Sequence, residues 1–153
     1  MFTSKVGLPA VARPTRLGRV MATRIPALAP KCRILIVDGD RKVSVALGFM
    51  LAARLYDDVR TVKSARRALA ISKQFLPEIV FLDLELPDDD GLEVARQLAE
   101  VARPLRPRLI ALTNHPEHLG REAARLAGFE RYLVKPISQE ELDKVLGIVR
   151  AAA

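Results

Sequence analysis

The chain has 153 residues, half of them apolar, which is enough for one domain with a buried core and a short extension. No apolar run approaches the length of a membrane span, so we expect a cytoplasmic protein that does not enter a membrane. The single cysteine, Cys32, excludes an internal disulfide framework and cannot build a metal site by itself.

The net charge of +7 is concentrated near the N-terminus. Residues 1–30 carry five basic residues and no acid, whereas residues 31–153 carry only +2, so the basic balance gives no reason to expect direct DNA binding. Residues 1–30 also contain four prolines and no sustained apolar period, which predicts a disordered basic tail ahead of a folded domain at 31–153. Three interpretations of the tail stay open: an arm that touches acidic partners, a targeting segment, or upstream sequence translated from a misassigned start ahead of Met21.

Apolar strands and amphipathic helices alternate from Arg33 onward. Residues 34–37 predict a buried strand, and residues 59–62 predict a second, shorter one. Between them lies a helix whose apolar residues recur at helical spacing, namely Val43, Leu47, Met50, Leu51 and Leu55. Ser64 is the expected N-cap of the next helix. The inner face of that helix is predicted to hold Ala65, Ala68, Leu69 and Ser72.

The alternation continues through three further strands, at residues 79–82, 109–112 and 132–134. The helix after the third strand contains Leu92, Val94, Ala95, Leu98 and Val101. The next helix is predicted to run through Leu119, Ala123 and Leu126 and to close at Gly128. Ser138 and Glu141 form a capping box. The apolar face that follows them consists of Leu142, Val145, Leu146 and Val149.

Five strands that alternate with five helices predict an α/β fold. Near-continuous apolar strands are typical of a parallel sheet that is covered on both faces. Right-handed crossovers then make a doubly wound five-stranded parallel sheet, with helices on both faces, the simplest arrangement.

Four of the apolar strands end on a polar residue, and the carboxyl ends of parallel strands share one edge of the sheet. These residues are Asp38, Asp83, Thr113 and Lys135. Each alone is most simply a cap or turn former, but four in succession predict a shared pocket. Carboxylates suit a divalent cation such as Mg²⁺, while lysine and threonine suit phosphoryl oxygens. An aspartate in that setting can be the nucleophile that forms an acyl phosphate.

The motifs that carry these residues resemble the receiver domain of bacterial two-component response regulators, in the CheY-like superfamily. They are Val37-Asp38, Leu82-Asp83 with Pro87 and Asp90-Gly91, Leu112-Thr113, and Tyr132-Leu133-Val134-Lys135-Pro136. The resemblance extends from about Lys31 to the C-terminus. It implies a flavodoxin-like sheet with the strand order 2-1-3-4-5.

The resemblance also implies a role for each residue of the pocket. Asp83 would be the phosphoacceptor, phosphorylated by a histidine kinase or phosphotransfer protein with Mg²⁺ as cofactor. Lys135 would contact the phosphoryl group. Thr113 and Tyr132 would act as a switch, although Tyr132 is equally explained as a half-buried strand aromatic. The bond to Pro136 would be cis. The surface of the last two helices would then change its affinity for a downstream protein effector, and it is also where a homodimer would form.

The sequence departs from the family at the metal site. Gly39 stands where members carry a second acid that ligates Mg²⁺, so the resemblance implies weakened affinity for the ion. Asp40 is one step further along and is expected to point away. Glu85 is the candidate replacement, which gives a metal set of Asp38, Asp83 and Glu85, and the alternative is a solvated loop glutamate.

Other polar residues near the pocket have simpler explanations. His115 and Glu85 fall at two positions that, in the family, tune how fast water removes the phosphoryl group; the alternative for His115 is an ordinary loop residue. Asp88 and Asp89 are expected to be solvated loop acids.

Three functions remain open at this point. The first is a single-domain response regulator of a phosphorelay, which is not an enzyme beyond its own phosphorylation and dephosphorylation. The second is a degenerate receiver that works as a phosphorylation-independent interaction module, for which Gly39 is the argument. The third and most remote is a phosphatase of the haloacid-dehalogenase type, because Asp38-Gly39-Asp40 follows an apolar strand. That motif usually continues into a turn with glycine and threonine, whereas Arg41 and Lys42 follow here.

Overall fold

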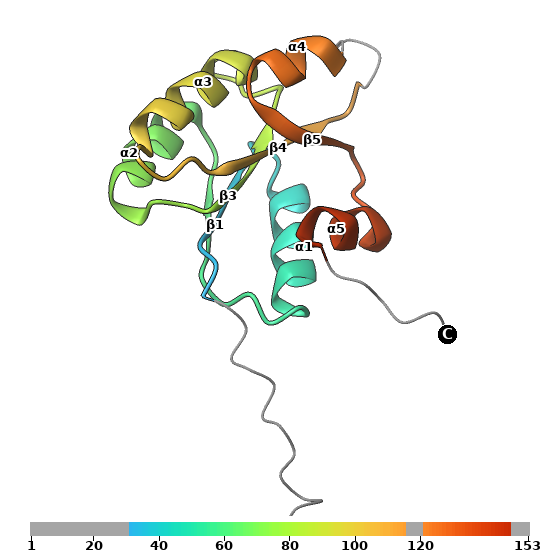
Figure 1. Ribbon diagram of the computed structural model, residues 1–153. Coiled ribbons are helices and arrows are strands. Elements are labelled where there is room, and N and C mark those ends of the chain that lie inside the picture. Colours follow the sequence, from blue (N-terminus) through green and yellow to red (C-terminus); the bar gives the residue numbers. More distant parts are fainter. Residues whose placement is uncertain (1–30, 116–120, 148–153) are drawn as a thin grey trace, which may run out of the picture. The chain divides into compact units, whose positions relative to one another are not determined.

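The structure is a computed structural model that describes residues 31–115 and 121–147. Its centre is a five-stranded sheet in which every pairing is parallel (Figure 1). The strands are β1 (Ile34–Val37), β2 (Val59–Val62), β3 (Ile79–Asp83), β4 (Arg108–Thr113) and β5 (Phe129–Val134). Their order across the sheet is β2-β1-β3-β4-β5, which confirms the predicted doubly wound fold and its strand order.

Helices cover both faces of this sheet (Figure 1). They are α1 (Arg41–Ala52), α2 (Ala65–Phe75), α3 (Gly91–Val101), α4 (Arg121–Leu126) and α5 (Gln139–Leu146). One apolar cluster joins α2, α3 and α4 to the sheet, and a second cluster joins α1 and α5 to the opposite face.

The strand side chains divide between the two clusters because successive residues of a strand point to opposite faces. In β1, Leu35 and Val37 belong to the cluster under α2 and α3, while Ile34 and Ile36 belong to the cluster under α1 and α5. All four are fully buried, as expected for a strand in the middle of a doubly covered sheet.

Side-chain caps fix where the helices begin. Ser64 accepts a hydrogen bond from Arg67 N and Ser138 accepts one from Glu141 N, so both predicted N-caps are confirmed. Asp40 and Asp90 cap α1 and α3 in the same way. Four of the five helices therefore start at a side chain that the local sequence supplies.

Two apolar residues of the predicted helices are exposed. Leu55 lies beyond the end of α1, with a φ of 66° and an exposed fraction of 65%. Leu126 ends α4 and is 67% exposed, whereas Ala124 and Ala127, the residue after the helix, are buried in the cluster on the sheet.

Some predictions concern parts of the chain beyond the described residues. Leu119 and Val149 fall there, as does the whole of the predicted tail at 1–30, which stays a prediction together with the domain boundary at 31. Within the described ranges, no helix is both long and apolar enough to cross a membrane.

A buried ion pair joins the two helices on one face of the sheet. Arg54, just after α1, donates from Nε to Asp143 Oδ1 of α5 at 2.7 Å, and each side chain is only 7% exposed. The same guanidinium donates to the carbonyl oxygen of Met50 at 2.7 Å and to the side chain of Gln139 at 2.7 Å. The sequence did not indicate this contact, because 89 positions separate the two charged residues.

Gly91 allows α3 to begin directly against the loop that follows β3. A Cβ atom at this position would lie 2.6 Å from Leu84 Cα, a backbone atom that cannot move aside cheaply. Gly48 in α1 is the opposite case, since a Cβ there would meet nothing within 4 Å.

We predict that Gly91→Ala lowers the free energy of unfolding by about 1–3 kcal/mol, the usual cost of overpacking. Gly48→Ala, the matched control, should raise it by about 0.5–1 kcal/mol, because alanine favours a helix interior over glycine. Urea unfolding monitored by circular dichroism measures both. Equal effects of the two substitutions would contradict the close approach at Gly91.

Candidate functional site

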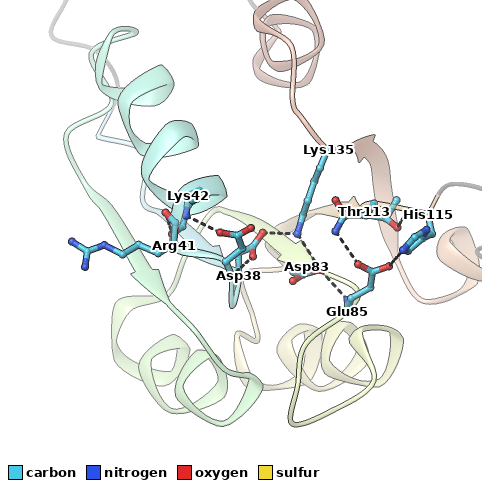
Figure 2. A network of polar contacts seen from close by, with 11 residues as sticks. Asp38, Arg41, Lys42, Asp83, Glu85, Thr113, His115 and Lys135 are labelled. Atoms are coloured by element: carbon cyan, nitrogen blue, oxygen red, sulfur yellow. Dashed lines mark hydrogen bonds and ion pairs between the residues drawn. The ribbon is translucent and has the colours of Figure 1, made fainter.

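The ends of three strands bring three buried, charged side chains together at the carboxyl edge of the sheet (Figure 2). Asp38 follows β1 and is fully buried, and Asp83 ends β3 with 5% of its surface exposed. Lys135 follows β5 and places Nζ 2.8 Å from Asp38 Oδ2 and 3.4 Å from Asp83 Oδ1. The sequence had placed these residues in one pocket, and the distances confirm that they meet.

Thr113, the fourth residue of the predicted pocket, ends β4 and is fully buried. Its carbonyl oxygen accepts a hydrogen bond from Lys135 N at 2.8 Å, which holds the two strand ends side by side (Figure 2). Its hydroxyl oxygen accepts one from His115 N at 3.0 Å. Thr113 therefore lies at the same edge of the sheet, next to the lysine.

Backbone N–H groups orient both carboxylates. Asp40 N donates to Asp38 Oδ1 at 2.7 Å, and Glu85 N donates to Asp83 Oδ1 at 2.9 Å. Each bond comes from the residue two positions later, as in an Asx turn. The chain turns sharply after each strand, and the carboxylates stay at the strand ends.

The charges of this group do not balance, because two carboxylates share one ammonium. Burial raises the pKa of Asp83, the charge of Asp38 raises it further, and the Glu85 N–H and Lys135 oppose both effects without cancelling them. Burial lowers the pKa of Lys135, but the hydrogen bond to Asp38 and the charge of Asp83 more than reverse this and leave it above the usual value. The lysine is therefore charged, and the pocket keeps an excess of negative charge that suits a cation.

The donor set for a divalent cation is nevertheless small. Within the described residues, no group of three or more His, Cys, Asp or Glu side chains is arranged to hold a metal ion. Gly39 contributes no side chain, and the carboxylate of Asp40 accepts a hydrogen bond from Lys42 N at 2.8 Å as the N-cap of α1. A Cβ on Gly39 would stand 3.7 Å from Pro87 Cδ and 3.8 Å from Lys63 O, which are ordinary contact distances. The position therefore has room for a larger residue.

Glu85 turns toward the loop after β4 instead of toward the two aspartates (Figure 2). Asn114 Nδ2 donates to its Oε2 at 3.1 Å, and His115 Nε2 lies 3.6 Å from its Oε1. The two positions that the resemblance linked to phosphoryl hydrolysis thus lie in contact. The role of Glu85 as a metal ligand stays a prediction, and it requires the carboxylate to leave these partners.

Asp88 has a contact that sequence reasoning missed. Its carboxylate accepts from Ala65 N at 3.0 Å and from Arg66 N at 3.2 Å, at the start of α2. The hydrogen bond from Ala65 N is the main reason why the pKa of Asp88 is lowered. The side chain is exposed, but its interpretation as a merely solvated loop acid was wrong. Ser64 already explained the cap of α2, so nothing in the sequence called for a second acceptor 23 positions away.

The remaining predicted residues lie on β5 and directly after it. The peptide bond between Lys135 and Pro136 is cis, as the resemblance implies. Tyr132 is half-buried and packs against the cluster under α2, α3 and α4. It also lines a cavity of about 510 Å³ formed by α4, β5 and α5, which Phe129 and Lys144 line as well.

Comparison with known proteins identifies the family of this chain. Residues 34–147 match the response regulator receiver domain family. A 14.6 kDa uncharacterised protein in the sodA1 3′ region of Leptolyngbya boryana is 32% identical over 116 residues, which cover 74% of this chain and 86% of that protein. Response regulator MprA of Mycolicibacterium vanbaalenii is 38% identical over 110 residues, which cover 72% of this chain but only 46% of MprA.

Solved structures show the same fold. The CheY-like response regulator receiver domain from Methylobacillus flagellatus has a TM-score of 0.68 and 29% identity, with 76% of this chain and 96% of that one covered. The Saccharomyces cerevisiae co-crystal structure of the histidine phosphotransfer protein Ypd1 with the receiver domain of Ssk1 has a TM-score of 0.68 and 26% identity, with 76% and 86% covered. The chain therefore belongs to the response regulator receiver domain family, a family of signalling domains of two-component systems.

Proposed function

We propose that Asp83 accepts a phosphoryl group and that the chain signals by protein–protein contact. The observation that carries this proposal is the pairing of Asp83 with Lys135 at 3.4 Å, in a buried site at the edge of the sheet. A buried carboxylate can act as a nucleophile, and the ammonium held beside it can neutralise the negative charge of the phosphoryl group once it is attached.

The reaction is transfer of a phosphoryl group from nitrogen to oxygen. An oxygen of the Asp83 carboxylate attacks the phosphorus of a phosphohistidine, and the new P–O bond forms as the P–N bond breaks. The leaving imidazole nitrogen keeps the bonding electron pair and takes up a proton. Lys135 would neutralise charge on the phosphoryl oxygens, and the Thr113 hydroxyl would donate a hydrogen bond to one of them.

The two aspartates fit a divalent cation, because their carboxylates converge and their charge exceeds that of Lys135. Asp38 and Asp83 would hold Mg²⁺, and Glu85 is the third and weakest candidate. When bound, the ion neutralises charge on the phosphoryl oxygens. Gly39 removes one carboxylate from the set, so we expect weak binding.

The donor would be a histidine kinase or a phosphotransfer protein. Support comes from the solved complex in which a similar receiver domain is bound to the histidine phosphotransfer protein Ypd1. The receiver would act in the cytoplasm. Thr113 and Tyr132 would change position with the phosphoryl group, and the cavity that Tyr132 lines between α4 and α5 would bind a downstream effector or a second copy.

Gly39 supports a second candidate, a degenerate receiver that binds partners without phosphorylation. The phosphatase hypothesis has less support, because the carboxylate of Asp40 is engaged as the N-cap of α1. The first two candidates differ in one measurable property, the ability of Asp83 to be phosphorylated.

We predict that incubation with phosphoramidate and Mg²⁺ adds one phosphoryl group to the chain, detected by intact-mass spectrometry. Asp83→Asn should abolish the adduct, because the amide is a poor nucleophile. Asp89→Asn, a change of the same kind in an exposed loop acid, should leave it unchanged. Wild-type protein without an adduct would favour the degenerate receiver.

The raised pKa of Asp83 predicts a stability difference that depends on pH. A group whose folded pKa is raised stabilises the fold while it is protonated, and that contribution is lost as the pH rises through the folded pKa. Asn cannot ionise, so Asp83→Asn should be more stable than wild type at neutral pH. The difference should vanish at acidic pH. Urea unfolding across the pH range measures it, and a less stable variant at neutral pH would contradict the charge imbalance.

We predict that Gly39→Asp binds Mg²⁺ about tenfold more tightly than wild type, because it adds a carboxylate where the backbone has room for one. Isothermal titration calorimetry with MgCl₂ measures the change. Glu85→Ala serves as the comparison and should change the affinity by less than about threefold, because Asn114 and His115 hold that carboxylate. A larger loss would establish Glu85 as a ligand.

A further inference from the structure

The loop that follows the phosphoacceptor holds the N-termini of two helices. Asp88 accepts hydrogen bonds from the first two N–H groups of α2, and Asp90 accepts one from Leu92 N at 3.0 Å at the start of α3. Helix N-terminal N–H groups have no partner within their own helix, so each depends on an acceptor from outside. The Asp90 bond is local, but the Asp88 bonds join the loop to a separate element.

The first half of this loop is fixed in several ways. Leu84 N donates to Leu112 O at 3.0 Å, and the side chains of Leu84 and Leu86 are buried. Pro87 Cδ lies near Gly39. The chain between Asp83 and Asp88 therefore has little freedom, and a displacement at one end is passed to the other.

Phosphorylation changes a bond at the Asp83 end. Glu85 N donates to Asp83 Oδ1, which carries part of the carboxylate charge. An acyl phosphate has no such charge on its carbonyl or bridging oxygen, so this hydrogen bond loses its charge assistance. The loop backbone at Glu85 thus responds directly to the chemical state of Asp83, three residues before the bonds to α2.

We propose that Asp88 is a positioning residue that couples the phosphorylation state of Asp83 to the N-terminus of α2. This inference rests on the proposed function, since it requires Asp83 to be phosphorylated. If it is right, phosphorylation changes the structure at the start of α2, on the face of the sheet that α2 and α3 cover, in addition to the surface of α4 and α5.

The amides of Ala65 and Arg66 report on the coupling, because they are the donors to Asp88. Residue-resolved hydrogen exchange by NMR is measured with and without phosphoramidate and Mg²⁺, and intact mass gives the phosphorylated fraction. In wild type we expect phosphorylation to change the exchange rates of both amides by at least about threefold. In Asp88→Ala both should exchange about fivefold faster before phosphorylation and then respond to it no further.

Two variants separate coupling from general damage. Asp89→Ala removes a neighbouring acid that contacts only Asp90 N in this loop, and it should behave as wild type. Asp88→Asn keeps one acceptor oxygen and should give an intermediate response. Circular dichroism checks that each variant is folded.

The outcomes are distinguishable. A phosphorylated Asp88→Ala variant whose Ala65 and Arg66 amides still respond as in wild type would overturn the coupling, and so would a phosphorylated wild type with no response at these amides. Wild-type protein without an adduct would overturn the proposed function and the coupling with it, and the mass spectrum identifies that case.

Discussion

One ammonium group between two buried carboxylates is the interaction on which the site depends. Lys135 contacts both Asp38 and Asp83. Removal of the lysine would leave two buried carboxylates without a counter-charge, and removal of both aspartates would leave a buried ammonium without one. Strand order brings it about, since β1 and β3 are neighbours at the centre of the sheet and β5 lies two positions from β3. The buried strands therefore serve two purposes, because the apolar packing that stabilises the domain also fixes the ends from which the charged side chains project.

The loop from Leu84 to Gly91 is the second constraint. Its backbone contacts Asp83 at one end, and at the other end Gly91 lets α3 begin against Leu84. Between them, the loop gives an acid to α2 and another to α3. A segment held at this many points has few alternative conformations, which keeps the surroundings of the phosphoacceptor pre-organised.

The amino-acid sequence alone predicted the fold and the charged cluster, because both depend on short-range patterns. Four apolar runs ending on Asp38, Asp83, Thr113 and Lys135 were enough to place those residues at one edge once the strands were taken as parallel. Contacts between segments far apart in the chain could not be predicted in this way. The hydrogen bonds of Asp88 to α2 depend on how two loops lie in space. The local sequence around an exposed aspartate after a proline does not indicate which residue it will contact. Leu126 lies in a helix, as predicted, but apolar periodicity alone did not indicate that alanines would face the sheet.

The buried pair of Arg54 and Asp143 has a consequence for how the surface of α4 and α5 can respond. The guanidinium of Arg54 donates to the carbonyl oxygen of Met50 in α1, to Asp143 and to Gln139 at the start of α5. If α5 moved away, this guanidinium would remain buried without its counter-charge, which is costly. The described part of α4 has no comparable tether and rests on two alanines. We therefore expect α4 to move more readily than α5 when the cavity beside Tyr132 changes its width.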